Sequence, residues 1–289
     1  LSGGASRDTW RFEADGRPLV LQRQRQGDVR DLSVEMATIR AAAAAGVPVA
    51  TIVAASAEAT QLGAAYMILT HIDGETTPRK ILRDERFAKA RRLLPAQLAK
   101  ALVAVHSIDS RSVPGLFDVD QIEHYRQVLD ELGEPHPTFE LALRWLEANR
   151  PRPTGDVVVH GDFRLGNFVV GDEGLRAVLD WELAHVGDPM EDLGWLCVKS
   201  WRFGSALPAA GLADYDELFA AYGAAGGGAV DRDVVRWWEV LGTMKWGIMC
   251  IAQAAAHRTG VTRSHELAAI GRRVCENEHD LFLALDGHW

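Results

Sequence analysis

The sequence predicts an α+β protein with two lobes, a small β-rich lobe at the N-terminus and a large, mostly helical lobe at the C-terminus. Residues 1–72 hold short apolar runs of strand-like composition that are separated by turn residues. After Asp73-Gly74 the apolar residues recur at helical spacing through most of the chain. We therefore expect lobes of residues 1–72 and 73–289, with a ligand cleft between them.

Four strands and one helix are expected in the N-terminal lobe. Asp15-Gly16 is a hairpin turn signal between the first two strands. A helix is predicted at residues 29–45, because apolar residues from Leu32 to Ala43 form one stripe, and Asp28 is its expected N-cap. The strands are predicted at residues 9–14, 19–24, 49–55 and 64–72.

Helical periodicity dominates the C-terminal lobe. Helices are expected at residues 84–106, 119–132 and 138–149. Pro95 is expected to start a new helix within the first of these ranges, because proline cannot donate the backbone hydrogen bond of a helix interior. A short apolar strand at 157–159 opens a β-rich patch that extends to Trp181, and the remainder is predicted to be helical.

Composition excludes several classes of function. The 289 residues carry a formal net charge of −9, which disfavours a binding face for nucleic-acid phosphates. No apolar run approaches the ~18 residues of a membrane span, and the N-terminus shows no secretory signal pattern. The chain lacks an initiator Met, so Leu1 is not expected to be its natural start. Three widely spaced cysteines indicate a reducing compartment, the cytoplasm.

The strongest chemical signal is the run His160-Gly161-Asp162-Phe163-Arg164-Leu165-Gly166-Asn167, followed by Leu179-Asp180-Trp181-Glu182. Its pattern H-x-D-x-x-x-x-N resembles the catalytic loop of protein kinases and their relatives. Phosphoryl transfer needs a carboxylate that accepts a hydrogen bond from the attacking hydroxyl, here Asp162. Oxygen ligands for Mg²⁺ are also needed, here Asn167 and Asp180, which a hairpin can bring to one end.

Glycine between His160 and Asp162 is typical of aminoglycoside phosphotransferases and choline kinases, and the chain resembles that superfamily over nearly its whole length. The runs VVVHGDFRLGNFVV and AVLDWELAHVGDPMEDLGWL are especially similar to the kinase-like domains associated with acyl-CoA dehydrogenases. The resemblance implies a protein-kinase-like fold, ATP or GTP as phosphate donor, and a small-molecule hydroxyl acceptor such as a hydroxyacyl-CoA or an amino alcohol. Nucleic-acid and membrane partners are not expected.

Nucleotide contacts are expected at both ends of the N-terminal lobe. Gly3, Gly4 and Ser6 resemble the family's phosphate-covering loop, since glycines let backbone N–H groups approach phosphates closely. A plain Gly-Gly turn explains these residues almost as well. The lobe is expected to lack the first strand of the fold, and the nucleotide base is expected at the linker from Thr70 to Ile72.

Glu35 shares the inward face of its predicted helix and therefore requires a partner. In kinases that partner is a strand lysine that also holds the nucleotide phosphates, but the matching strand here, residues 19–23, contains no lysine. Arg23, or less favourably Arg25, is predicted to replace it, because a guanidinium can bridge carboxylate and phosphate. A solvated Glu35 is the alternative.

Three further polar residues surround the motif. Asp188, Pro189 and Glu191 have the arrangement of a helix start with a capping box, so Asp188 is assigned to structure. Glu182 is as well explained by structure as by a metal or substrate contact. Arg164 is a candidate phosphate or substrate contact, and loop bracing explains it equally. Two alternatives to an active kinase stay open: a pseudokinase module that binds nucleotide without turnover, and a true aminoglycoside resistance enzyme.

Overall fold

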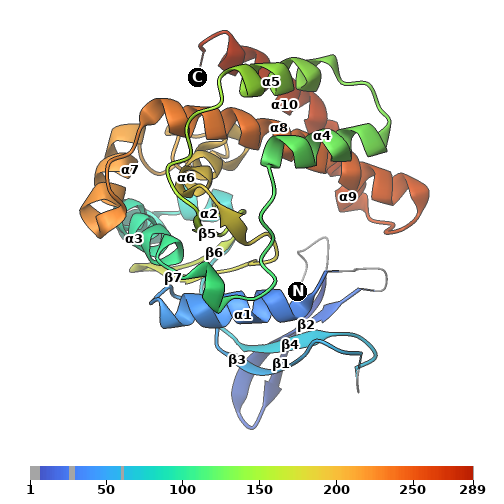
Figure 1. The fold of residues 1–289 in the computed structure, drawn as a ribbon. Helices are drawn as coiled ribbons and strands as arrows, with labels where there is room; N and C mark the ends of the chain where they lie inside the picture. Colours follow the sequence, from blue (N-terminus) through green and yellow to red (C-terminus); the bar gives the residue numbers. More distant parts are fainter. Residues whose placement is uncertain (1–6, 26–29, 60–61, 289) are drawn as a thin grey trace.

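The first hairpin forms where the sequence predicts it. In the computed structural model, which describes residues 7–25, 30–59 and 62–288, β1 (Arg7–Ala14) and β2 (Arg17–Gln24) pair antiparallel (Figure 1). Asp15 and Gly16 join them with φ angles of 51° and 70°. Both residues are in the left-handed region, as a tight hairpin turn requires.

The hairpin belongs to a four-stranded antiparallel sheet in the order β1-β2-β4-β3, which also contains β3 (Ile52–Ser56) and β4 (Tyr66–Thr70). Helix α1 (Leu32–Ala44) lies along this sheet (Figure 1). Its N-cap is Asp31, whose side chain accepts a hydrogen bond from the Ser33 amide at 2.8 Å. The predicted cap, Asp28, is therefore wrong, and it lies outside the described residues.

The remaining chain is mostly helical. Pro95 does not start a helix, contrary to prediction, but lies inside the continuous helix α3. Proline in a helix interior costs about 3 kcal/mol, and α3 offsets this by burying Leu94, Leu98 and Leu102 along one face. The helices of this part are α2 (Pro78–Arg83), α3 (Ala88–His106), α4 (Gln121–Leu132), α5 (Pro137–Ala148), α6 (Pro189–Cys197), α7 (Tyr215–Tyr222), α8 (Arg232–Thr259), α9 (His265–Ile270) and α10 (Val274–Leu285).

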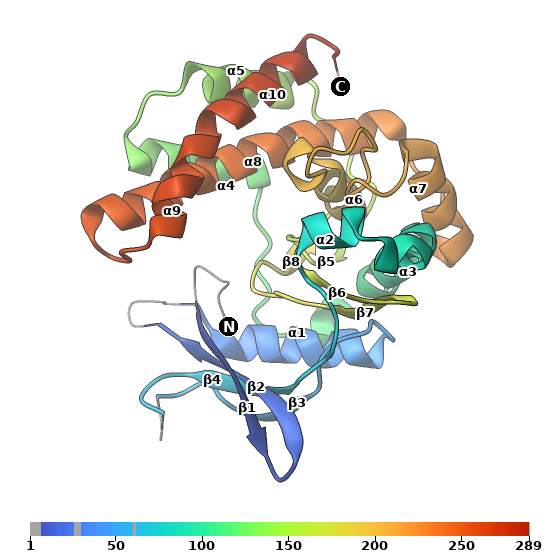
Figure 2. The ribbon, with the colours of Figure 1, turned by 180° about the vertical axis from the view of Figure 1, so that it is seen from behind.

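Two small antiparallel pairs interrupt the helices. β5 (Val157–Val159) pairs with β8 (His185–Gly187), and β6 (Phe168–Gly171) pairs with β7 (Gly174–Val178). Both pairs lie between the four-stranded sheet and the long helix α8 (Figures 1 and 2). The loops that leave them are thus directed at the junction between the two parts of the molecule.

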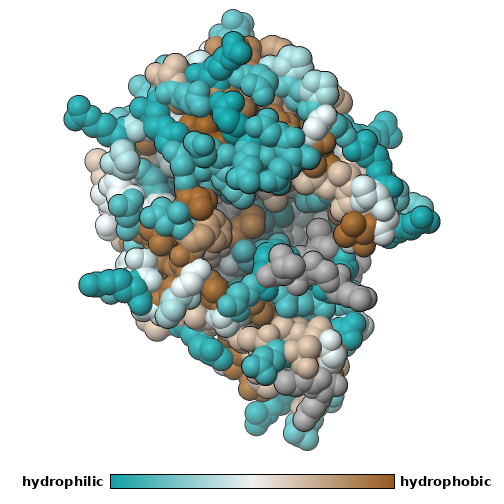
Figure 3. All heavy atoms as spheres, turned by 45° about the vertical axis from the view of Figure 1, so that its right-hand side comes forward, coloured by the Kyte–Doolittle hydropathy of each residue, from teal (hydrophilic) through white to brown (hydrophobic). Residues whose placement is uncertain are grey.

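Apolar side chains from both parts share one core, in which Met67 of β4, Leu98 of α3 and Phe168 of β6 are all fully buried. The surface is hollowed between the sheet below and the helices above (Figure 3). This arrangement confirms the predicted α+β class with a small β-rich N-terminal part. Among the described residues, no helix combines the length and apolar character needed to cross a bilayer.

Candidate active site

Asp162 lies on the loop between β5 and β6, and three hydrogen-bond donors hold its carboxylate. Its Oδ1 accepts from the indole Nε1 of Trp195 at 2.8 Å and from Nε of Arg164 at 2.9 Å, and its Oδ2 accepts from Nδ2 of Asn167 at 2.6 Å. The residue is only 7% exposed. Hydrogen bonds to a carboxylate are short and strong, so this side chain has one fixed orientation.

Only glycine fits at position 161, next to Asp162, because a side chain there would clash with the neighbouring backbone. Gly161 has φ of +75°, and a Cβ added to it would lie 2.3 Å from the carbonyl oxygen of Leu183. No other residue fits a backbone that is both left-handed and in this close approach. The loop therefore depends on the glycine that distinguishes the motif from that of protein kinases.

The backbone of Asn167 pairs with the strand end that leads to Asp180, at the open end of the β6–β7 hairpin. The amide of Leu179 donates to the carbonyl oxygen of Asn167 at 2.8 Å, which places Asp180 one residue beyond. Burial raises the pKa of Asp180 to about 8, and the charges of Glu182, Asp162 and Glu35 add to this effect. Such a concentration of carboxylates favours a bound cation.

His160 connects the two loops. It is fully buried, and burial lowers the pKa of its imidazole. Nε2 lies 3.0 Å from the carbonyl oxygen of Leu179, and Nδ1 accepts from the Asp162 amide at 3.2 Å. A neutral imidazole protonated on Nε2 satisfies both contacts, so His160 ties the Asp162 loop to the strand end that carries Asp180.

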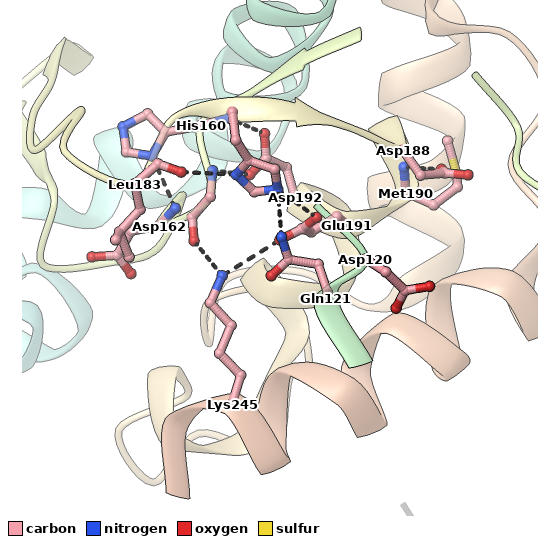
Figure 4. Close-up of polar contacts among 12 residues, drawn as sticks. Asp120, Gln121, His160, Asp162, Leu183, Asp188, Met190, Glu191, Asp192 and Lys245 are labelled. Atoms are coloured by element: carbon pink, nitrogen blue, oxygen red, sulfur yellow. Dashed lines mark hydrogen bonds and ion pairs between the residues drawn. The ribbon is translucent and has the colours of Figure 1, made fainter. Parts of the chain in front are cut away.

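Asp192, in the first turn of α6, binds the backbone of the same loop. Its fully buried carboxylate accepts from the amides of His160 and Gly161 at 2.8 and 2.9 Å (Figure 4). It also contacts His106 Nε2 at 3.2 Å. Burial opposes ionisation, but these hydrogen bonds prevail and lower the pKa of Asp192. Sequence reasoning missed this residue, because nothing in the spacing of α6 points back to the loop.

Lys245 is a second residue that sequence reasoning missed. It lies in the middle of α8, is 2% exposed, and its Nζ donates to the carbonyl oxygen of Gly161 at 3.1 Å (Figure 4). It also lies 3.4 Å from Oε1 of Glu191, whose other oxygen is 3.1 Å from His185 Nε2. The sequence does contain a sign of this role: Lys245 is a single lysine in an apolar stretch of α8, and a buried ammonium needs a partner.

Helix α6 begins as predicted, with Asp188 as the N-cap that accepts from the Met190 amide at 2.8 Å. Asp188 also binds the backbone amide of Thr154. The structural interpretation of Asp188 is therefore confirmed. The capping box is wrong, because the side chain of Glu191 turns inward to Lys245 and His185 instead of back to the cap.

Glu35 faces inward, as predicted, but its partner is Arg7. Nη1 of Arg7 donates to Oε1 of Glu35 at 2.7 Å and Nη2 donates to Oε2, with both residues buried. The prediction that Arg23 pairs with Glu35 is wrong. Arg23 is half exposed, lies 3.4 Å from Asp8, and stacks on Trp10.

Strand register explains the correction. Arg23 lies opposite Asp8, whereas Gln22 lies opposite Thr9 on one side and the fully buried Met67 on the other. Because successive side chains alternate between the faces of a strand, Gln22 faces the covered side of the sheet and Arg23 faces away. Arg25 also binds Asp8, at 3.0 Å.

The remaining predicted residues divide into three groups. Glu182 pairs with Arg30 at 2.8 Å, and Arg164 stacks on Trp201 at 4.4 Å while it binds Asp162. Thr70 ends β4 and its hydroxyl accepts from the Thr51 amide at 3.0 Å, with Ile72 two residues further along the linker. The predicted phosphate loop lies outside the described residues: Gly3, Gly4 and Ser6.

Oxygen donors make the hairpin end suitable for Mg²⁺. Asn167 offers its amide oxygen, since its Nδ2 already donates to the Asp162 carboxylate and carbonyl, and Asp180 offers a carboxylate. No group of three His, Cys, Asp or Glu side chains in the described part of the chain could hold a metal. A two-residue oxygen site suits Mg²⁺, which binds proteins through one or two ligands and takes the rest from substrate phosphates and water.

The family comparison agrees with this arrangement: the chain belongs to the phosphotransferase enzyme family, whose model matches residues 1–238. Mouse acyl-CoA dehydrogenase family member 10 is 26% identical over 231 residues, 74% of this chain and 21% of that protein. Chicken acyl-CoA dehydrogenase family member 11 is 27% identical over 214 residues, 67% of this chain and 27% of that protein. The chain thus spans about a quarter of the length of these relatives.

Solved structures share the fold. A putative aminoglycoside phosphotransferase from Ralstonia eutropha superimposes with a TM-score of 0.74 at 21% identity, covering 99% of this chain and 94% of that one. A choline/ethanolamine kinase family protein from Mesorhizobium loti gives 0.67 at 19% identity, covering 96% and 88%. The GDP complex of aminoglycoside 2′-phosphotransferase-IIIa gives 0.68 at 13% identity, covering 97% and 91%. The predicted kinase-like fold is confirmed.

Proposed function

We propose that this protein is a Mg²⁺-dependent kinase that transfers the γ-phosphoryl group of ATP or GTP to a hydroxyl group of a small molecule. One observation carries the proposal: the buried carboxylate of Asp162 is oriented by three donors, one of which is Asn167, and Asp180 follows the residue whose amide binds the Asn167 carbonyl. A fixed carboxylate next to a cation site is what phosphoryl transfer between two oxygens requires.

Asp162 has the role of orienting the acceptor. Oδ1 already accepts two hydrogen bonds and Oδ2 accepts one, so Oδ2 is the atom with capacity for the acceptor hydroxyl. The hydroxyl oxygen forms a bond to the γ-phosphorus while the bond from that phosphorus to the β,γ-bridging oxygen breaks. The hydroxyl proton passes to Asp162 and then to solvent, and the nucleoside diphosphate leaves.

Asn167 and Asp180 would hold the Mg²⁺, which supplies neutralisation of the phosphate charge when bound. Residues 1–72 would bind the nucleotide, with Gly3, Gly4 and Ser6 over the phosphates and the base at Thr70 to Ile72. Residues 73–289 would supply the catalytic and acceptor groups. GTP is a reasonable donor beside ATP because a neighbouring fold was solved with GDP.

The acceptor class is suggested by the relatives. Two of them are acyl-CoA dehydrogenase family members, which favours a hydroxyacyl-CoA-type acceptor, and a choline/ethanolamine kinase family neighbour favours an amino alcohol. An aminoglycoside acceptor is the third possibility, supported by fold alone. A pseudokinase loses part of its support, because Glu35 is paired although the strand lysine is absent.

ADP and GDP release, measured across hydroxyacyl-CoAs, amino alcohols, sugars and aminoglycosides, tests the proposal. Turnover with one acceptor class, which is lost on chelation of Mg²⁺ and in Asp162→Asn, is the expected result. Nucleotide binding without turnover on any acceptor would support the pseudokinase module instead. Turnover confined to aminoglycosides would identify a resistance enzyme.

A further inference from the structure

The lysine that kinases place on the strand facing the nucleotide is missing from β2, and Glu35 pairs instead with Arg7 of β1. The covered face of the sheet presents Gln22 from β2 and, on the neighbouring strand, Thr9 and Arg7, because paired residues share a face and alternate residues return to it. Arg7 is therefore the one arginine of the described part of this hairpin that the register and the Glu35 contact both place inside.

We infer that Arg7 is the residue that binds the phosphates of the nucleotide, while Glu35 holds it in place. This inference rests on the proposed kinase function and deepens it by assigning a phosphate contact that the strand sequence lacks. Arg7 is the first residue of β1, and its guanidinium lies between Glu35 of α1 and Glu182, two residues after Asp180.

The guanidinium of Arg7 has N–H groups that are not used by Glu35. It carries five N–H groups, of which Glu35 takes one from Nη1 and one from Nη2. Nε of Arg7 is buried and has no hydrogen-bond partner among the described residues. Since a buried unpaired N–H group costs free energy, the edge formed by Nε and Nη2 is suited to a second planar or tetrahedral anion.

The surroundings place that edge beside the cation site. Oε2 of Glu182, two residues after Asp180, lies 3.8 Å from Nη2 of Arg7, and the charge of Asp180 also acts on this guanidinium. Phosphates bridged to a cation on Asp180 would consequently lie within the reach of Arg7. An arginine that binds carboxylate on one side and phosphate on the other thus replaces a lysine that would do both with one ammonium group.

A double variant separates phosphate binding from simple neutralisation of Glu35. Arg7→Gln alone leaves a buried carboxylate unpaired and can fail to fold, so the informative protein is Arg7→Gln/Glu35→Gln, in which both charges are removed. Arg17→Gln is the matched control, because Arg17 is an exposed arginine of the same hairpin. Thermal unfolding monitors the fold of each protein, and calorimetric titration measures the Kd of MgATP, MgGTP, adenosine and guanosine.

The double variant is expected to bind the preferred triphosphate roughly tenfold to hundredfold more weakly than wild type, the range for a hydrogen bond to a charged group. Affinity for the matching nucleoside, and for the triphosphate in Arg17→Gln, should stay within about twofold of wild type. Wild-type triphosphate affinity in the double variant would show that Arg7 only neutralises Glu35 and would overturn the inference. Absence of nucleotide binding by the wild type would overturn the proposed function itself.

Discussion

Trp195→Phe tests whether the orientation of Asp162 limits the reaction. The indole N–H donates to Oδ1 of Asp162 at 2.8 Å, and Trp195 is 2% exposed. A hydrogen bond to a charged group contributes about 1.5–3 kcal/mol. Phenylalanine keeps most of the ring volume but has no donor, so the carboxylate keeps Arg164 and Asn167 and loses one of three constraints.

A loss of 1.5 kcal/mol in the transition state corresponds to about a tenfold lower kcat. The KM for nucleotide should be unchanged, because the indole N–H donates to Asp162, the residue proposed to orient the acceptor, and phenylalanine keeps the ring between Trp201 and Lys245. Trp237→Phe is the matched control: its buried Nε1 donates to the backbone of Leu146 at 3.0 Å, in a different part of the core. Both variants should lose similar stability in urea, about 1–3 kcal/mol from the smaller ring and the lost bond.

Steady-state kinetics of the two variants at saturating nucleotide give the answer. A tenfold fall in kcat for Trp195→Phe beside an unaltered kcat for Trp237→Phe is expected. Wild-type kcat in Trp195→Phe, or an equal fall in both variants, would refute the reasoning, because general destabilisation would then explain the effect.

Three further changes have defined outcomes. Asp180→Ala should abolish the Mg²⁺ dependence of nucleotide binding in calorimetry while circular dichroism shows an intact fold, and Mg²⁺-stimulated binding in this variant would exclude Asp180 as a ligand. Lys245→Met should lower the free energy of unfolding in urea by about 3–5 kcal/mol, because it removes one of the two charged partners of the buried Glu191 carboxylate and the donor to the Gly161 carbonyl. Adding Glu191→Gln should recover part of that loss, and no recovery would contradict the pairing. Gln22→Lys added to Arg7→Gln should restore triphosphate affinity, since a lysine there faces the same side of the sheet. An affinity as low as that of Arg7→Gln/Glu35→Gln would contradict a phosphate site on this face.

Much of the candidate site could be predicted from residues that are close together in the sequence. His160 through Asn167 and the segment from β7 to Asp180 are close in the chain, so a hairpin turn suffices to pair the backbone of Asn167 with Leu179, next to Asp180. The same holds for the first hairpin, where Asp15-Gly16 determines the turn and thus the pairing. Contacts between residues that are close in the chain depend on few backbone angles, so the sequence can predict them.

Contacts between distant segments were not predictable in this way. Trp195 and Lys245 reach the loop of Gly161 and Asp162 from α6 and α8, across 33 and 84 residues of chain, and only the packing of the helices brings them there. The choice between Arg7 and Arg23 depended on the face of β2, and a shift of one residue reverses every side chain on a strand. Pro95 shows the same limit for helices, since burial outweighed its local preference.

Transfer of a radiolabelled γ-phosphoryl group from ATP or GTP to a hydroxyl acceptor tests the proposed activity most directly. Wild type and Asp162→Asn should be compared on the acceptor that gives the fastest diphosphate release, with the labelled product separated and counted. We predict Mg²⁺-dependent labelling by the wild type that is at least about 100-fold faster than by Asp162→Asn, the range for a general base. Equal labelling rates, or diphosphate release without a labelled acceptor, would contradict a kinase in which Asp162 directs the acceptor hydroxyl.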